Sequence, residues 1–222
     1  MQVKVFKAIA FFVLVSLSAY SQSTFVELKT SKGTIVIMLY DKTPMHKQMF
    51  INEIKKGTYE NAVFNRVIKD FVSQAGELDD SILNREKRNP QKTPLRLPAE
   101  INSELIHKNG ALGAGRDDNP EKSSYFNQIY LVSGKVLNDE QLDKLEEKTG
   151  KKMSSKTREI YKTQGGVPRL DNDYTIFGEI VEGQSVADQI NKVETNNKDV
   201  PMKAVVFDAK VLTKWKVKVR NK

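Results

Sequence analysis

The segment FNRVIKDFVSQAG, residues 64–76, is the most informative stretch of this 222-residue chain. It overlaps residues 62–74 (AVFNRVIKDFVSQ), which are strand-like. In an extended strand, Arg66 falls in register with Phe64 and Ile68. An arginine on an apolar face is either a surface residue whose stem covers apolar area or a functional cation, because charge is seldom buried alone.

Short strand-like segments also lie on both sides of this stretch. The first of them alternates around a Ser-Lys-Gly turn and predicts a hairpin. The strand-like segments are residues 26–39, 62–74, 124–132, 174–181 and 205–219. Many short strands with few helices favour an antiparallel sandwich or barrel over a βαβ fold, and periodicity alone does not choose between them.

Two short helices and a long loop complete this pattern. Thr43 and Pro44 are typical of a helix start, and Gly57 of its end. The expected buried stripe of this helix is Met45, Met49, Phe50 and Ile54. A second helix is expected over residues 184–193, and the proline-punctuated residues 77–98 are expected to form a loop.

Residues 136–166 differ from the rest because they are helical in pattern and highly charged, with 6 acidic and 7 basic residues. Asn138 and Gln141 predict a capping box, and Gly150 ends the helix that they start. A second short helix is expected over about residues 155–162. We interpret the segment as an insertion between two strands, either inert or a lid beside a binding groove.

The N-terminal residues 1–21 have the pattern of a secretory signal peptide. Two lysines precede an apolar run from Ala8 to Leu17, which is too short to span a bilayer, and small residues follow. The alternative is an anchoring or buried helix. We therefore expect an exported protein, periplasmic or secreted, whose single domain spans residues 22–222 and which has no membrane contact after cleavage.

The composition excludes several classes of chemistry. The chain has no cysteine and 2 histidines, so disulfides, zinc–cysteine sites, iron–sulfur clusters, thiol catalysis and a histidine-rich metal site are excluded. No Gly-x-Ser-x-Gly, phosphate-binding glycine loop or His-Glu-x-x-His motif is present. Residues 210–222 hold six basic residues and no acidic one, and basic and apolar residues alternate over 214–220. This alternation favours a strand with a charged outer face over a patch that binds nucleic acid or anionic lipid.

Five separate motifs resemble the cyclophilin family and occur in the family's order. Residues 64–76 match its signature at Phe64, Arg66, Val67, Ile68, Phe71, Gln74 and Gly76. The other four motifs are residues 97–100 (LPAE), 107–112 (HKNGAL), 127–132 (NQIYLV) and 170–183 (LDNDYTIFGEIVEG). The resemblance implies a closed eight-stranded antiparallel β-barrel capped by two α-helices and peptidyl-prolyl cis–trans isomerase activity without a cofactor or metal.

The resemblance also implies roles for particular residues. Arg66 would donate to the prolyl nitrogen, Gln74 would orient Arg66, and Phe71 would act with them. The residues expected to bind substrate are Val72, Gly115, Arg116, Gln128, Tyr130, Leu170 and Tyr174. Of these, Gln128 and the backbone near Gly115 and Arg116 would bind the residues before the proline, and the others would line the proline pocket. The expected partners are proline-containing polypeptides, and the protein is expected to be a monomer.

Three departures from the family pattern qualify this expectation. Bulky Tyr125 and Phe126 stand where the family has small residues, which predicts a crowded groove before the proline. Gly115 and Arg116 replace the usual pair, and Arg169 stands where many eukaryotic members have tryptophan. We hypothesise an isomerase of lowered or shifted activity that assists folding of exported proteins. The alternative is a catalytically weak or inactive peptide-binding or chaperone module on the same fold.

Overall fold

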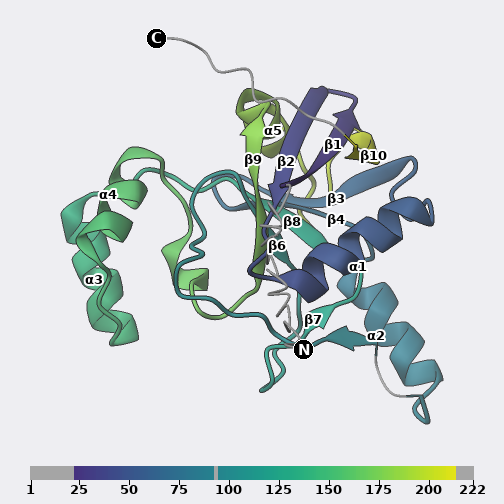
Figure 1. The fold of residues 1–222 in the computed structure, drawn as a ribbon, viewed down its shortest axis with the longest axis horizontal. Coiled ribbons are helices and arrows are strands. Elements are labelled where there is room, and N and C mark those ends of the chain that lie inside the picture. The colour runs from purple at the N-terminus through teal and green to yellow at the C-terminus, as the bar shows by residue number, and fades with distance from the viewer. Residues whose placement is uncertain (1–22, 93–94, 214–222) are drawn as a thin grey trace, which may run out of the picture.

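Eight strands close into an antiparallel barrel, in the order β1-β10-β3-β4-β8-β6-β9-β2 (Figure 1). The computed structural model describes residues 23–92 and 95–213. The barrel strands are β1 (Thr24–Thr30), β2 (Gly33–Leu39), β3 (Ala62–Ile68), β4 (Val72–Ala75), β6 (Ala111–Ala114), β8 (Ile129–Val132), β9 (Ile176–Glu182) and β10 (Val206–Leu212). A separate pair joins β5 (Arg96–Leu97) to β7 (Ser124–Tyr125). The expected barrel is confirmed, and the choice between barrel and sandwich is settled.

The expected hairpin forms between β1 and β2. Thr30 pairs with Gly33, and the register continues without a shift to Thr24 and Leu39. Gly33 has a φ of 135°, a conformation open to glycine and strained for other residues. The turn chemistry therefore sets the register, as the sequence predicts.

The barrel interior and the two capping helices share one apolar core. Helix α1 (Pro44–Lys55) contributes Met49 and Phe50, and helix α5 (Gln184–Asn191) contributes Ala187 and Ile190. Both helices therefore cover the barrel, as expected. The prediction that Met45 belongs to the buried stripe of α1 is wrong, because Met45 is 42% exposed.

Residues 77–98 do not form the predicted loop, because they contain helix α2 (Asp79–Arg88). Two acidic residues in its first turn and three basic residues in its last turn suit the helix dipole. Only Ile82 is buried, so the segment has almost no apolar period from which a helix is predicted.

Two predicted strands are each divided in the structure. The segment 62–74 forms β3 and β4 around a turn at Asp70, whose φ is 61°. The segment 124–132 forms β7 and β8, which belong to different sheets. Strand β10 begins as expected, whereas the predicted continuation to residue 219 and the predicted signal peptide lie outside the described residues.

The insertion forms the two predicted helices, α3 (Asp139–Thr149) and α4 (Ser155–Thr163), beside the barrel (Figure 1). The capping box of Asn138 and Gln141 is present, and Gly150 ends α3 in the left-handed conformation. A short 3-10 helix, η1 (Pro168–Leu170), returns the chain to the barrel. Across the ranges described, no helix has the length and apolar character that crossing a membrane requires.

Candidate functional site

Three of the predicted site residues lie in one row across neighbouring strands. Arg66 of β3 pairs with Gln74 of β4, and Gln74 pairs with Tyr130 of β8. Residues that pair directly across a sheet point to the same face. Gly113 of β6 continues the row, and a Cβ atom there would lie 2.2 Å from the Tyr130 ring. The Tyr130 ring therefore needs a glycine beside it.

A β-bulge decides which way Arg66 points. Phe64 pairs with Ala75 but Arg66 pairs with Gln74, so β3 contains one extra residue at Asn65. Phe64 and Val67 then lie in the barrel core, while Arg66 lines the pocket on the outer face. The predicted register is corrected here, because Arg66 does not share a face with Phe64.

All ten predicted site residues line one pocket of about 280 Å³ on the outer face of the barrel. They are Arg66, Phe71, Val72, Gln74, Gly115, Arg116, Gln128, Tyr130, Leu170 and Tyr174. Two further residues, Asp79 and Arg169, complete the lining. The structure thus brings together residues from three strands (β3, β4 and β8), helix α2, η1 and the loops around them.

The base of this pocket is apolar because β8 alternates between two cores. Ile129 and Leu131 face the barrel interior, while Tyr130 faces a second cluster outside. That cluster includes Val72 and Leu170 and is covered by Phe71 and Tyr174. The result is an apolar recess bordered by aromatic rings, which suits a small nonpolar ring.

Buried hydrogen bonds hold the Tyr130 ring in place. Its hydroxyl lies 2.9 Å from Nε2 of His107, and Nδ1 of His107 lies 2.9 Å from a carboxylate oxygen of Asp171. Because the carboxylate accepts from Nδ1–H, Nε2 is left to accept from the Tyr130 hydroxyl. Burial raises the pKa of Tyr130 well above its usual value, which keeps this hydroxyl protonated.

The insertion joins the same set of contacts. Tyr161 of α4 is fully buried and donates to the other oxygen of Asp171 at 2.6 Å. Burial is the main reason why the pKa of Tyr161 lies far above its usual value. The connected residues Tyr161, Asp171, His107 and Tyr130, called here the Tyr161–Tyr130 chain, therefore link the insertion to the pocket floor.

Arg66 is held loosely compared with its neighbours. Its Nη1 lies 3.5 Å from Oε1 of Gln74, and its Nε lies 3.7 Å from a carboxylate oxygen of Asp199. The side chain is 41% exposed. These long contacts orient the guanidinium and leave donors for a bound molecule.

At the end of the pocket formed by Gln128 and Gly115, the side chain of Gln128 makes contacts within the protein. The Gln128 amide donates to the carbonyl of Glu77 at 2.8 Å and to the carboxylate of Asp79 at 2.5 Å. A Cβ atom on Gly115 would lie 1.8 Å from the Gln128 side-chain oxygen. Gln128 therefore occupies space that an alanine at position 115 would need.

Arg116 is the most constrained cation of the pocket. Its guanidinium donates to the carbonyls of Asp117 and Asp173 and to the Asp173 carboxylate, and it stacks over the Tyr174 ring at 4.5 Å. Only 6% of its side chain is exposed. Arg116 thus fixes Tyr174 and the loop around it, leaving only its backbone for the expected contact with a ligand.

The predicted crowding by Tyr125 and Phe126 is wrong. Tyr125 is buried below the guanidinium of Arg96, 4.5 Å from its ring centre, and Phe126 packs against the barrel core. Neither residue lines the pocket. Tyr125 belongs to β7 of the separate two-stranded sheet and Phe126 lies between β7 and β8, so neither is part of a barrel strand that lines the pocket.

Two pocket residues, Asp79 and Arg169, have no role predicted from the sequence. Asp79 lies in the segment that is expected to be a loop. The sequence signal that could have revealed a helix there is the acidic pair Asp79 and Asp80 in the first turn of α2. Arg169 stacks over the Phe71 ring with its guanidinium carbon 4.2 Å from the ring centre. No sequence pattern predicts that contact, because the two residues are far apart in the chain.

Comparison with known proteins places these observations in context. Residues 25–211 match the family described as cyclophilin type peptidyl-prolyl cis-trans isomerase/CLD. The peptidyl-prolyl cis-trans isomerase A of Dickeya dadantii is 28% identical over 213 residues, which cover 90% of this chain and 94% of that protein. Peptidyl-prolyl cis-trans isomerase cyp18 of Streptomyces antibioticus is 28% identical over 193 residues, covering 84% and 98%.

Solved structures show the same fold. A Cryptosporidium parvum cyclophilin type peptidyl-prolyl cis-trans isomerase, crystallised in the presence of the dipeptide Ala-Pro, superposes with a TM-score of 0.61. The sequence identity is 16%, and the match covers 86% of this chain and 99% of that one. At 16% identity, this similarity establishes the fold and nothing more.

Proposed function

This chain belongs to the family of cyclophilin-type peptidyl-prolyl cis-trans isomerases, and we propose that its isomerase activity depends on Arg66 beside the apolar recess of the pocket. The observation that carries the proposal is the row of Arg66, Gln74 and Tyr130, with a cation at one end and an aromatic recess at the other.

The reaction needs no nucleophile, metal or general base. Rotation about an Xaa–Pro amide has a barrier of about 20 kcal/mol, because the resonance of the amide is lost when it twists. The prolyl nitrogen gains lone-pair character in the twisted state. A donor placed beside that nitrogen binds the twisted state more tightly than either planar isomer, and each 1.4 kcal/mol of such preference is about a tenfold acceleration.

The pocket offers these elements in the required order. The proline ring would enter the recess of Val72, Tyr130 and Leu170, bordered by Phe71 and Tyr174. The guanidinium of Arg66, a planar fork of donors, would reach the prolyl nitrogen. Gln74, 3.5 Å away, would orient it. Gln128 and the Gly115 and Arg116 backbone would bind residues before the proline.

We further propose that the substrates are proline-containing polypeptides and that they are folding after export. The support for export is the signal-peptide pattern of residues 1–21. The catalytic pocket is complete within one chain, which is compatible with a monomer.

An exchange assay on a short Xaa–Pro peptide tests the proposal. Wild type should accelerate cis–trans exchange, and Arg66→Ala should lower kcat/KM by about 100-fold, the size of effect expected when one preorganised donor is removed. Arg66→Lys should recover only part of the loss, since an ammonium lacks the planar fork. Arg88→Ala, which removes an exposed arginine at the end of α2, is the matched control and should retain activity.

The same assay distinguishes an isomerase from the alternative, a peptide-binding module without catalysis. If wild type shows no catalysis, the isomerase proposal is wrong. If clients bind equally well to wild type and Arg66→Ala while neither catalyses exchange, a chaperone module on this fold is the better description.

A further inference from the structure

A second groove of about 630 Å³ runs between the insertion and the barrel. We call it the insertion groove and define it by Ile68, Phe71, Leu137, Leu145, Val167 and Arg169, which are among its lining residues. Leu137 and Leu145 come from the insertion, and the others come from the barrel side. Most of the groove's exposed surface is apolar, as expected from these side chains.

The insertion groove is continuous with the catalytic pocket. Arg66, Phe71 and Arg169 line both. The Arg169 guanidinium lies over the Phe71 ring, so the two residues form the boundary between the two recesses. A polypeptide that places its proline beside Arg66 therefore has a direct route into the insertion groove.

The wall contributed by the insertion is preorganised. Leu142 and Tyr161 are fully buried, and the backbone of Leu137 donates to the carbonyl of Tyr161 at 3.1 Å. At the base of the insertion, the Gly166 amide donates to the carbonyl of Lys135 at 3.1 Å. Because the wall is already ordered, a ligand does not have to order it on binding.

The charges that face the groove favour neutral or acidic ligands. Lys135 pairs with Asp70 at 3.0 Å, and Arg66 lies 3.7 Å from Asp199. Across residues 23–92 and 95–213, no carboxylate lies within ion-pair distance of the Arg169 guanidinium. Arg169 therefore gives the groove an unpaired positive charge, which repels lysine and arginine side chains.

The direction of the polypeptide follows from the two ends of the catalytic pocket. Gln128 and Gly115 lie at the end proposed to bind residues before the proline, and the insertion groove opens at the other end. Resting on the proposed function, we propose that the insertion groove binds the polypeptide segment after the proline and selects apolar side chains there over basic ones.

Three peptides that share the sequence up to the proline test this inference. They continue with Gly-Gly-Gly, Gly-Leu-Leu or Gly-Lys-Lys, and kcat/KM is measured for each by NMR exchange. We expect Gly-Leu-Leu to exceed Gly-Gly-Gly by about fivefold to tenfold, since buried leucine surface is stabilising. Gly-Lys-Lys should fall below Gly-Gly-Gly. A fourth peptide, with two leucines before the proline, should show no such gain.

Two variants locate the effect in the insertion groove. Leu145→Ser and Leu137→Ser should each bring the ratio of Gly-Leu-Leu to Gly-Gly-Gly towards one. Leu137 precedes α3, so its replacement removes apolar surface without interrupting the helix, and circular dichroism melts check both folds. Val136→Ser is the matched control, because Val136 is 58% exposed and does not line the groove. It should keep the wild-type ratio.

The outcomes separate this inference from the proposed function. No catalysis of any peptide contradicts the proposed function. Catalysis with equal rates for Gly-Gly-Gly and Gly-Leu-Leu overturns the groove inference alone, as does a gain only from leucines before the proline. A leucine gain that persists in both Leu137→Ser and Leu145→Ser also overturns it.

Discussion

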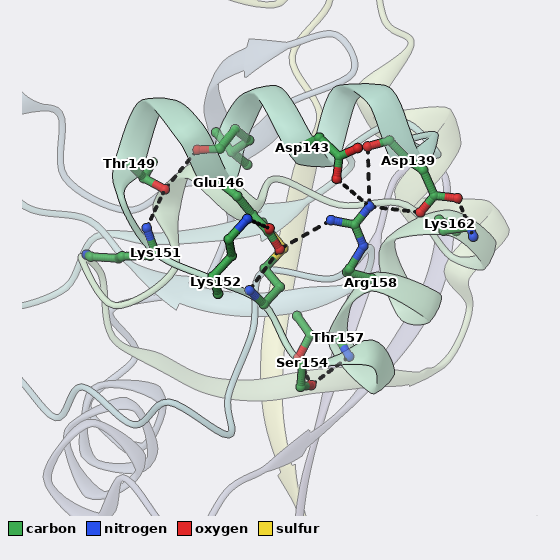
Figure 2. Close-up of polar contacts among 12 residues, drawn as sticks. Asp139, Asp143, Glu146, Thr149, Lys151, Lys152, Ser154, Thr157, Arg158 and Lys162 are labelled. Atoms are coloured by element: carbon green, nitrogen blue, oxygen red, sulfur yellow. Dashed lines mark hydrogen bonds and ion pairs between the residues drawn. The ribbon is translucent and has the colours of Figure 1, made fainter.

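The barrel and the insertion are held together by different forces. In the barrel, buried aromatic rings pack against one another, with Phe177 5.6 Å from Phe50 and Phe207 5.0 Å from Phe64 between ring centres. In the insertion, Arg158 of α4 contacts Asp139, Asp143 and Glu146 of α3 at 2.9, 2.9 and 3.2 Å (Figure 2).

This difference has consequences for how each region responds to its surroundings. Apolar burial is not screened by salt and carries no charge to titrate, whereas ion pairs near the surface weaken when salt is added and when acid protonates the carboxylate. In α3 and α4 the buried residues are Leu142, Glu146 and Tyr161. The insertion is therefore expected to rely on the barrel for its stability, while the barrel does not rely on the insertion.

Removing one aromatic ring from the barrel should give the largest effect. Phe177 is fully buried, and Phe177→Ala should cost about 3–5 kcal/mol through lost packing and an unfilled cavity. The melting temperature should fall by roughly 10 °C for a chain of this size. Calorimetry should show one transition, with α3 and α4 lost together with the barrel. Helices of the insertion that outlast the barrel would show that the two regions are independent.

Tyr161→Phe should break the link between the two regions. It removes the donor to Asp171, and a buried hydrogen bond to a charged acceptor is worth about 1.5–3 kcal/mol. Because Asp171 holds His107 against Tyr130, the substrate KM should rise by more than kcat falls. Urea titration and peptide kinetics measure the two effects.

A matched variant in the same helix separates this link from general loss of stability. Thr163→Ala removes an exposed hydroxyl that contacts the backbone of α4, and it should leave KM unchanged. If Tyr161→Phe is destabilised but keeps the wild-type KM, the Tyr161–Tyr130 chain does not position the pocket.

Arg158→Gln should weaken the insertion alone. The change leaves three carboxylates of α3 without their shared cation, so amide hydrogen exchange in α3 and α4 should become several-fold faster while exchange in the barrel strands stays the same. Salt at 1 M should narrow the difference between wild type and variant, because the screening length is then about 3 Å. Lys144→Gln, which removes one exposed pair with Glu140, should change little.

Acid should have the smallest effect, again in the insertion. The backbone amide of Met153, Lys152 and Arg158 together lower the pKa of Glu146 from its usual 4.5 to about 2. The stabilisation by this carboxylate is present above pH 4.5 and is lost as the pH falls towards 2. NMR shifts of the α3 amides should report that loss, and Glu146→Gln should remove the pH dependence. An unchanged profile in Glu146→Gln would assign the acid response to other groups.

Local patterns in the sequence predict much of the fold. The Ser-Lys-Gly turn, the proline that starts α1, and the capping box at Asn138 all depend on neighbours within a few residues. Helix α2 escapes prediction because one buried isoleucine leaves no apolar period. The bulge at Asn65 also escapes it, since only the pairing partner reveals an extra residue.

The candidate site also contains residues that the sequence predicts and residues that it does not. Its ten residues were predictable through the resemblance of separate motifs to a known family, and the structure places all ten around one pocket. The positions of Asp79 and Arg169 in that pocket, and the turn of Tyr125 and Phe126 away from it, were not predictable. Each of these depends on contacts between segments that lie far apart in the chain.

By itself, the sequence determined the β1–β2 hairpin, the start of α1 and the two helices of the insertion, because turns and caps act over a few residues. It also determined which side chains are available for chemistry. Only the tertiary structure decided that β1 closes on β10, that Arg158 sits among three carboxylates, and that α3 faces the pocket across a groove. These arrangements follow from packing between distant residues, and no local pattern records such contacts.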